Sequence, residues 1–380
     1  MVIAGPRPTL VAADAAPCSF NNAVLPAKVF AFQTCLASDG GAARLNLTVM
    51  RRKAADNGTA EAKGTTMTSL KHRSQAIPDP ENGQSVGKDL TDPLTIAAVI
   101  VYVLALVGLF LTANALWPAL LLGLGIAILS GVVLIATRRH TPPPVDVIRP
   151  RVELWLSLTW YGIVVLLAAF TNAIRLELVN QFTNWFFLVV IPFGLLLTAR
   201  RRGLALRTTL RSVRITRTGL KDGLRLSAMI VPLFIPVLYI VGEQQQAAVE
   251  MILYKPLQAL GSFLVSFPVA LLTAGFVEEF FFRGVLQSRL ARCTGSEWHG
   301  LLIASLLFGL FHLPMYFFSP FEPTHGNLLW ALSSVITEQA VTGILLGVLW
   351  VRTHNLAAPL LVHALTNALA LMTMVRLGTG

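Results

Sequence analysis

Ionisable side chains within apolar segments are the features of this sequence that could carry out chemistry. A charge placed in hydrocarbon costs at least about 2.5–3.5 kcal/mol on insertion scales, so ionisable residues within membrane spans are rare and usually functional. Three polar groups interrupt apolar runs in the C-terminal third of the chain: Glu278, Glu279 and Arg283, then His312, then His363 and Asn367. Each group lies on a different apolar segment, and together they supply the candidate catalytic residues.

The first group combines two carboxylates with a guanidinium. On a helix Glu279 and Arg283 stand four residues apart and share a face, so they can form an ion pair. Glu278 lies about 100° away from Glu279 around the same helix. We therefore expect Glu279 to pair with Arg283 and Glu278 to serve in chemistry. In the third group, His363 and Asn367 also share a helix face, one turn apart.

A carboxylate and two imidazoles in a dry pocket supply what amide hydrolysis requires. Water must be deprotonated, and the oxyanion of the tetrahedral intermediate must be stabilised. Glu278 is the expected base, His312 is expected to hold the water, and His363 with Asn367 to donate to the oxyanion. The set Glu278, His312 and His363 also suits a Zn2+ ion with an open coordination position. The residues alone leave open whether a metal takes part.

Structural roles compete with each of these assignments. An ion pair at a helix end, or a hydrogen-bonded histidine in a core, is common and would be the better explanation for any single pair of residues. The joint occurrence of three polar groups on three apolar segments favours a site. Glu338, in another apolar segment, is a further candidate, although a packed polar contact is the more common role for such a residue.

The order of these motifs resembles that of the CPBP intramembrane protease family, also called the Abi or type II CAAX prenyl endopeptidase family. The family pattern is E-E-x-x-x-R, then F-x-x-x-H, then H-x-x-x-N, each on a separate transmembrane helix. This chain carries Glu278-Glu279 with Arg283, Phe308 with His312, and His363 with Asn367, in that order and without a departure. Each motif alone is weak evidence, whereas the ordered set of three is strong.

The resemblance implies an intramembrane endopeptidase with Glu278 as catalytic base, His312 positioning the water, and His363 with Asn367 on the oxyanion side. The family is labelled metalloprotease, yet a metal-free glutamate mechanism is also proposed for it, so both Zn2+ and no cofactor stay open. Its eukaryotic precedent for a substrate is a prenylated CAAX-type protein. The expected partner is therefore a membrane-associated protein or peptide substrate.

The motifs lie in a chain with the composition of a membrane protein. Of its 380 residues, 54% are hydrophobic and 13% are charged, about half the charged share of an average soluble domain. The net charge of +11 is explained by basic residues near span ends, so nucleic acid is not expected as a partner. The three cysteines have no C-x-x-C spacing, which excludes a cysteine-rich zinc site.

About nine apolar segments approach the roughly 20 residues that a spanning helix needs. They run approximately over residues 95–115, 117–137, 153–172, 182–199, 226–242, 256–277, 299–313, 328–350 and 357–375. The sixth is expected to continue past its apolar part, and the seventh is short. The predicted fold is an all-α, polytopic transmembrane helix bundle whose last four spans hold the site.

The basic residues indicate the orientation of this bundle. With a cytoplasmic N-terminus, the cytoplasmic loops contain most of the arginines, among them Arg138, Arg139, Arg200, Arg289 and Arg352, and the opposite face has Arg175, Lys255 and Arg376. The positive-inside rule therefore predicts N-in and C-out. Residues 206–225 place leucines and arginines at helical spacing, which predicts an amphipathic helix on anionic lipid, with a solvated basic linker as the alternative.

The chain divides into three predicted parts. Residues 1–92 have no sustained apolar run and are interpreted as a disordered tail, a transit peptide or an extension before the true start. Residues 93–250 hold the first transmembrane helices with the basic connector, and residues 251–380 hold the catalytic transmembrane domain. The protein is expected in the plasma membrane, or in a plastid membrane if the tail is a transit peptide.

Two other functions compete with proteolysis. A transporter would be favoured by inverted repeats and by broken helices in both halves of the chain, but the ionisable residues within spans concentrate in the last four. A non-catalytic scaffold or immunity protein of the same fold is the second alternative. The intact set of Glu278, His312 and His363 argues against a loss of catalysis.

Overall fold

The computed structural model describes residues 92–375, except residues 114–115, 143–144, 175–183, 201–209, 212–216 and 321. Within these ranges every regular element is a helix and no strand occurs. Apart from Asp92, the described residues belong to one compact unit. The predicted all-α fold is therefore confirmed. The predictions for the tail concern residues that lie, except for Asp92, outside the described part of the chain.

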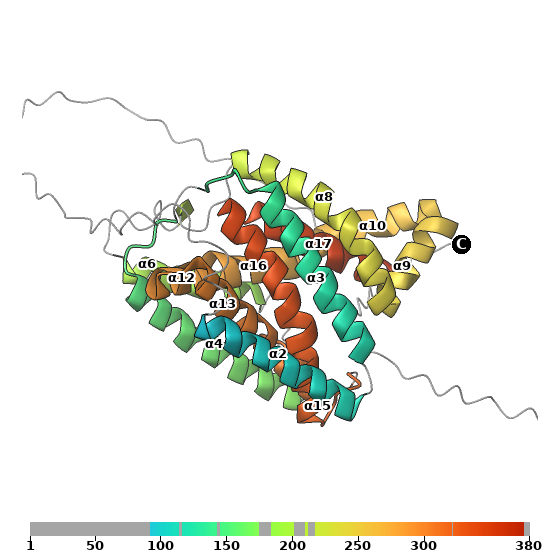
Figure 1. Cartoon of the computed structure of the whole chain (residues 1–380), viewed down its shortest axis with the longest axis horizontal. Coiled ribbons are helices and arrows are strands. Elements are labelled where there is room, and N and C mark those ends of the chain that lie inside the picture. The colour runs from blue at the N-terminus through green and yellow to red at the C-terminus, as the bar shows by residue number, and fades with distance from the viewer. Residues whose placement is uncertain are drawn as a thin grey trace, which may run out of the picture. The chain divides into compact units, whose positions relative to one another are not determined.

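Helices follow one another along the whole described sequence (Figure 1). The first half contains α2 (Pro93–Thr112), α3 (Leu116–Ala136), α4 (Pro150–Ala173), the π-helical η1 (Phe186–Val190), α6 (Ile191–Ala199), α8 (Arg217–Val241) and α9 (Glu243–Tyr254). The second half contains α10 (Pro256–Ala270), η2 (Leu271–Gly275), α11 (Phe276–Glu279), η3 (Phe280–Gln287), α12 (Ser288–Thr294), α13 (Glu297–Phe311), α14 (Leu313–Phe318), α15 (Leu328–Ser334), η4 (Val335–Ala340), α16 (Val341–Thr353) and α17 (Ala357–Met372).

Seven helical stretches of the described chain are long and apolar enough to cross a membrane: Pro93–Thr112, Leu116–Ala136, Pro150–Ala173, Leu220–Val241, Pro256–Thr294, Glu297–Phe318 and Leu328–Thr353. Phe186–Ala199 and Ala357–Met372 are shorter apolar helices. Together they correspond to the nine predicted segments, and the sixth continues past its apolar part as expected. The protein is an integral, multi-pass membrane protein.

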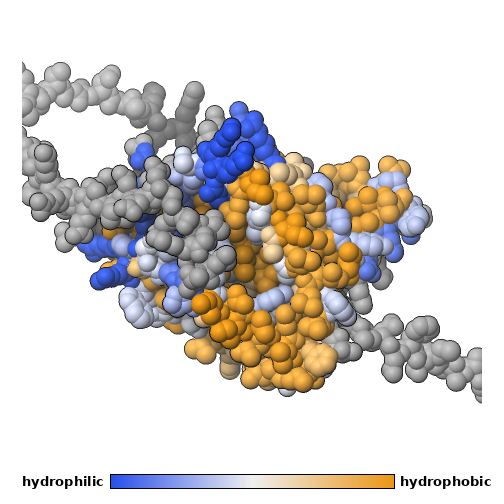
Figure 2. Space-filling view, in the orientation of Figure 1, coloured by the Kyte–Doolittle hydropathy of each residue, from blue (hydrophilic) through white to orange (hydrophobic). Residues whose placement is uncertain are grey.

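The stretches differ in how far they face the lipid. In Leu328–Thr353, 72% of the most apolar window is buried, compared with 11% in Pro150–Ala173. The α16 helix within the first of these stretches packs against α3, α13 and α17, and α3 packs on α8 (Figure 1). Hydrophobic residues cover the surface over α2 in the space-filling view (Figure 2). The core thus surrounds α16, and the outer helices present apolar side chains to the bilayer.

The connector before the fifth predicted span differs from its prediction. Residues from Arg217 onward form the first turns of α8, which continues directly into the spanning stretch Leu220–Val241. Leu220 and Leu224 are exposed there. The second half of the predicted interfacial helix is therefore part of the spanning helix, and residues 201–209 and 212–216 lie outside the described residues. The α9 helix, Glu243–Tyr254, occupies a stretch where no helix was expected.

A tight turn reverses the chain between α12 and α13. Gly295 has a φ of 73°, a left-handed conformation that a glycine adopts without steric cost. The Ser296 hydroxyl then accepts a hydrogen bond from the His299 backbone N–H at 3.3 Å and caps the start of α13. Because α12 and α13 pack together, this turn directs α13 back along the helix that carries the two glutamates.

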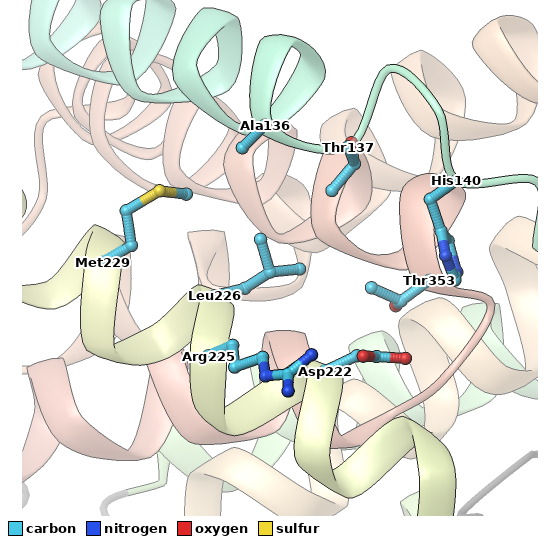
Figure 3. Close-up of a pocket in the computed structure, with 8 residues that line it drawn as sticks. All are labelled: Ala136, Thr137, His140, Asp222, Arg225, Leu226, Met229 and Thr353. Atoms are coloured by element: carbon cyan, nitrogen blue, oxygen red, sulfur yellow. The ribbon is translucent and has the colours of Figure 1, made fainter.

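A pocket of about 280 Å3 lies where α3 ends, α8 begins and α16 ends (Figure 3). It is lined by Ala136, Thr137, His140, Asp222, Arg225, Leu226, Met229 and Thr353. None of these is a predicted site residue. The pocket is therefore a separate feature of the fold.

Candidate active site

The two glutamates lie on a short α-helix between two π-helical segments. Only four residues, Phe276–Glu279, form α11, with η2 before it and η3 after it. Single π-helical turns inside α-helices occur frequently at functional sites. At Gly275, the last residue of η2, a Cβ would lie 3.2 Å from both Ala364 Cβ and Leu360 Cδ1 of α17. A glycine here thus allows α17 to approach α11 closely.

His312 lies at the break between α13 and α14. Pro314, near the start of α14, has no backbone N–H, so the hydrogen bonds of α13 cannot continue through it. The His312 Nδ1 atom is 2.8 Å from the Phe308 carbonyl oxygen. Because a carbonyl oxygen only accepts, Nδ1 carries the proton and donates. This bond orients the ring and directs Nε2 toward Glu278.

The Glu279 carboxylate forms an ion pair with Arg283 and a hydrogen bond with His363. Its Oε2 lies 3.1 Å from Arg283 Nε, and its Oε1 lies 2.8 Å from His363 Nδ1. Glu279 and Arg283 are fully buried. The predicted ion pair is therefore present, and the bond to His363 adds a contact that the sequence did not predict. Since the carboxylate accepts, His363 donates from Nδ1, and its Nε2 is left facing Glu278.

Glu278 stands at the point where the two histidines converge. Its Oε2 is 3.9 Å from His312 Nε2 and 3.9 Å from His363 Nε2. These distances exceed a direct hydrogen bond, which extends to about 3.2 Å, and suit a water molecule between the groups. The side chains of Glu278 and His312 are 11% exposed and that of His363 is 8% exposed. Residues from three separate segments thus meet at a position that is shielded but accessible.

Asn367 lies on α17 one turn after His363 and is half-buried. Its side chain makes no hydrogen bond to the residues that the structure describes. Its two N–H donors therefore have no acceptor among the described residues. Its predicted role at the oxyanion stays a prediction.

Phe308 connects the parts of the cluster. Its ring centroid is 5.0 Å from that of His312 and 5.9 Å from that of His363, both in edge-to-face geometry. The Arg283 guanidinium carbon lies 5.0 Å from the same centroid. A ring in this position restricts both imidazoles and stabilises the buried cation. The motif phenylalanine therefore has a packing role within the cluster.

The spacing of Glu278, His312 and His363 differs from that of the ligands in a zinc site. Ligand atoms of tetrahedral zinc lie about 3.3 Å apart, given metal–ligand distances of about 2.0–2.2 Å. The separations of 3.9 Å are wider, and within the described ranges no three His, Cys, Asp or Glu residues form a group that could hold a metal ion. At these separations the three side chains do not fit a tetrahedral zinc ion.

Glu338 has a polar contact with a neighbouring helix. The Tyr316 hydroxyl donates to Glu338 Oε2 at 3.0 Å and accepts from Gln339 Nε2 at 3.0 Å. Tyr316 is fully buried and lies one turn after His312. This is the packed polar contact named above as the more common role. It joins η4 to α14 beside the break that positions His312.

We expect Tyr316→Phe to lower the free energy of unfolding by about 1–3 kcal/mol, because it removes a hydroxyl that serves two buried partners. Hydrolysis per folded molecule should fall less than about tenfold, since the hydroxyl touches none of the reacting groups. Chemical denaturation and a cleavage assay measure the two effects, with Tyr239→Phe on the exposed side of α8 as control. If Tyr316→Phe kept normal stability and lost hydrolysis by more than about a hundredfold, the hydrogen bonds of Tyr316 would instead have a direct role in catalysis.

Gly309, three residues before His312, permits close packing of α13 on η4. A Cβ at this position would lie 2.8 Å from the Val335 carbonyl oxygen and 2.9 Å from Ala340 Cβ. We expect Gly309→Ala to cost about 1–3 kcal/mol, the usual effect of overpacking a core, and to reduce hydrolysis by displacing His312. Gly131→Ala is the matched control, because a Cβ there meets nothing within 4 Å. Equal stability of the two variants, measured by chemical denaturation, would contradict the packing argument.

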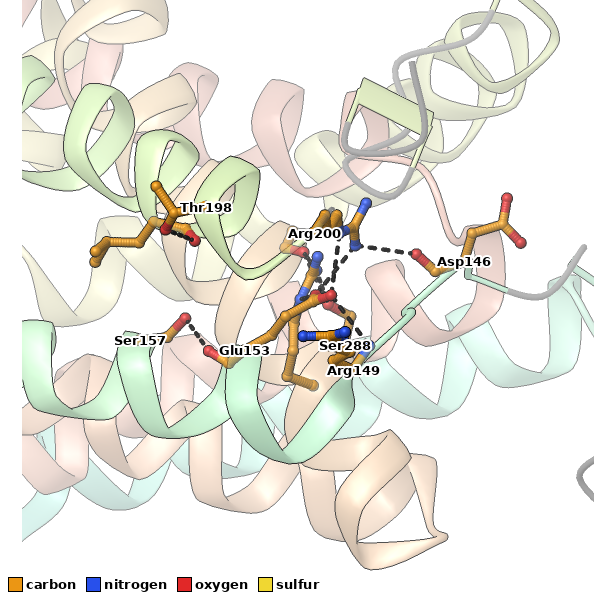
Figure 4. Close-up of polar contacts among 10 residues, drawn as sticks. Asp146, Arg149, Glu153, Ser157, Thr198, Arg200 and Ser288 are labelled. Carbon is orange, nitrogen blue, oxygen red and sulfur yellow. Dashed lines mark hydrogen bonds and ion pairs between the residues drawn. The ribbon is translucent and has the colours of Figure 1, made fainter. Parts of the chain in front are cut away.

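A second buried ionic cluster was not predicted. Glu153 of α4 binds Arg200, whose Nε lies 3.0 Å from Oε1 (Figure 4). It also binds Arg289, whose Nε lies 3.1 Å from Oε2. All three side chains are buried. Arg289 was expected in a loop, and that expectation was wrong, because it lies on α12 with Glu153 as a buried counter-charge. Arg200 directly follows α6 and is buried against the same carboxylate. The acidic residue at the start of an apolar segment was the signal that could have indicated the pairing.

Helices from the first half of the chain also support the site. The Tyr161 hydroxyl of α4 donates to the Leu307 carbonyl of α13 at 2.8 Å. The Trp185 indole N–H donates to the Leu272 carbonyl of η2 at 2.8 Å. Leu307 belongs to the helix that ends before His312, and η2 directly precedes α11, which carries the two glutamates. The first spans therefore help to position the site.

Comparisons with known proteins bear on the same segment. Residues 260–369 match the family model described as type II CAAX prenyl endopeptidase Rce1-like. Searches among curated proteins and among solved structures found no match. The matched residues include all three polar groups whose side chains meet in the cluster. Residues 260–369 are thus similar to the type II CAAX prenyl endopeptidase Rce1-like family, which is a family of proteases.

Proposed function

We propose that this protein is an intramembrane endopeptidase that hydrolyses a peptide bond of a membrane-associated protein with water activated by Glu278. The observation that carries the proposal is the convergence of His312 Nε2 and His363 Nε2 on Glu278 Oε2, each at 3.9 Å, within the residues that match the Rce1-like family model. Such an arrangement holds one water next to a carboxylate base and away from bulk solvent.

The first step is the attack of water on the scissile carbonyl. A water between Glu278 Oε2 and His312 Nε2 donates one hydrogen bond to each, and a lone pair of its oxygen is directed at the substrate. Glu278 takes the proton as the new C–O bond forms. His312 keeps its Nδ1–H on the Phe308 carbonyl, so its bare Nε2 positions the water throughout.

The second step is the collapse of the tetrahedral intermediate. His363 keeps its Nδ1–H on Glu279, so a proton on its Nε2 would be presented to the oxyanion, and the Asn367 amide supplies a second donor. When the C–N bond breaks, Glu278 returns its proton to the leaving amine. The products are a carboxylic acid and an amine, and Glu278 is again a carboxylate.

The substrate class follows from the family and from the location of the site. The family description names CAAX prenyl endopeptidases, so a prenylated C-terminal CAAX-type protein is the proposed substrate. A lipid-modified chain end reaches a site inside a helix bundle from the membrane. The match to a protease family supports hydrolysis over the transporter and the non-catalytic scaffold.

Membranes that express the wild type and the Glu278→Ala variant test this proposal. Comparison of their membrane proteomes is expected to show one or more intact precursors that accumulate with Glu278→Ala. A farnesylated CAAX peptide should release its C-terminal tripeptide with the wild type alone. Identical proteomes together with an uncleaved peptide would contradict the protease assignment.

The orientation is proposed from the basic residues, with the N-terminus in the cytoplasm and the C-terminus outside. In a cysteine-free background, Arg139→Cys should react with a membrane-impermeant reagent from the cytoplasmic face, and Lys255→Cys from the opposite face. Both positions are exposed, so failure to react would not come from burial. Labelling of both from one face would overturn the orientation.

A further inference from the structure

The pocket between α3, α8 and α16 plays no part in the proposed hydrolysis. The pocket is apolar toward one end, where Ala136 and Met229 lie, and ionisable toward the other, where His140 and Asp222 lie (Figure 3). Leu226 lies between these groups. A pocket with an apolar part and an ionisable part suits an amphipathic ligand.

Two opposite charges face this pocket from one helix. Asp222 and Arg225 stand three residues apart on α8, so they share a face, and both line the pocket. Neither forms an ion pair with any side chain that the structure describes. Opposite charges that line one pocket without pairing are suited to a ligand that carries both charges itself.

The surroundings of the pocket are strongly basic. Arg138 and Arg139 are exposed and directly follow the lining residue Thr137 in the sequence. Lys221 directly precedes the lining residue Asp222. Arg352 donates from Nε to Thr137 Oγ1 at 2.8 Å and from Nη2 to the His140 carbonyl at 3.2 Å. Figure 2 shows hydrophilic residues gathered where α8 begins. This charge favours a ligand with a phosphate group.

We propose that the pocket binds the headgroup of an aminophospholipid. Arg225 and His140 hold the phosphate, since a guanidinium forms paired hydrogen bonds to phosphate oxygens. Asp222 accepts hydrogen bonds from the primary ammonium, which has three N–H donors. Basic pockets between transmembrane helices are known to bind lipid headgroups.

The apolar lining identifies a membrane lipid, rather than free phosphoethanolamine, as the source of this headgroup. Past Ala136 and Met229, the acyl chains reach the exposed side chains of Leu134 and Ile135 on α3 and Leu233 on α8. These side chains belong to stretches that are apolar enough to span the membrane. Hydrocarbon chains along them would bury surface that a soluble headgroup leaves uncovered.

Native mass spectrometry of the full-length protein tests the proposal with equal amounts of phosphatidylethanolamine, phosphatidylcholine and phosphatidylglycerol. Phosphatidylethanolamine should be retained preferentially, because the quaternary ammonium of the choline lipid has no N–H donor and the glycerol lipid has no ammonium. Asp222→Asn should reduce the preference over phosphatidylcholine about tenfold, the effect of losing one hydrogen bond to a charged group. Arg225→Gln should weaken retention of all three lipids.

Matched controls remove the same charges outside the pocket. Glu250→Gln on α9 and Lys255→Gln directly after α9 change exposed residues that do not line it, and both should retain the wild-type preference. Unchanged helicity by circular dichroism would show that Asp222→Asn and Arg225→Gln still fold. The Glu278→Gln variant should also retain the lipid, so a failure of the proposed proteolysis is distinguishable from a failure of this site.

Several outcomes would overturn the proposal. They are equal retention of the three lipids by the wild type, a preference for phosphatidylglycerol, and an Asp222→Asn variant that still prefers phosphatidylethanolamine. Soluble O-phosphoethanolamine should displace the lipid poorly at equal concentration. Equal displacement would show that the acyl chains contribute nothing and that a soluble ligand is the occupant.

Discussion

Glu278→Gln is expected to abolish peptide-bond hydrolysis while the protein still inserts and folds. The substitution keeps the shape of the side chain and removes the carboxylate that takes the proton from water. Positioned general bases contribute typically about 10²–10⁴-fold to a rate. Here the loss should be toward the upper end, because the neighbouring carboxylate of Glu279 is already bonded to Arg283 and His363 and cannot replace it.

The cleavage rate per folded molecule in nanodiscs measures this effect. The melting temperature should stay close to that of the wild type, because an amide has nearly the shape of the carboxylate and adds no buried charge. Glu250→Gln makes the same chemical change on an exposed position of α9 and should retain full activity. A Glu278→Gln variant that cleaves at the wild-type rate would show that another group activates the water.

Local sequence spacing was sufficient to predict the contact between Glu279 and Arg283. Both residues lie on one continuous helical stretch, so their separation of four residues determines that they are neighbours. The apolar segments were predictable for a similar reason, since a bilayer sets the length and composition of each span. These features depend on one segment at a time.

Contacts between segments could not be derived from spacing. His363 is 84 residues from Glu279, and their bond depends on how closely α17 approaches α11. The pairing of Glu153 with Arg289 spans 136 residues. An arginine at the end of a span has the same sequence appearance whether it faces lipid headgroups or a buried carboxylate. The positive-inside rule therefore identified Arg289 as a loop residue, although the fold places it in the core.

Glu279 and Arg283 allow stability and catalysis to be separated experimentally. Glu279→Ala leaves the fully buried guanidinium without its counter-charge, and breaking a buried ion pair in this way costs about 3–5 kcal/mol. The same substitution removes the acceptor of the His363 Nδ1–H bond. We therefore expect Glu279→Ala to lower both the free energy of unfolding and the rate of hydrolysis.

The double variant Glu279→Leu with Arg283→Met tests whether the loss of stability and the loss of hydrolysis have separate causes. Replacement of a buried ion pair by apolar residues of similar size is often neutral or stabilising, so chemical denaturation should show that most of the lost stability returns. Hydrolysis should not return, because no carboxylate then accepts the hydrogen bond from His363 Nδ1 and orients its ring. If the double variant were as active as the wild type, the ion pair would have a structural role alone, and the assignment of His363 to the oxyanion would lose its support.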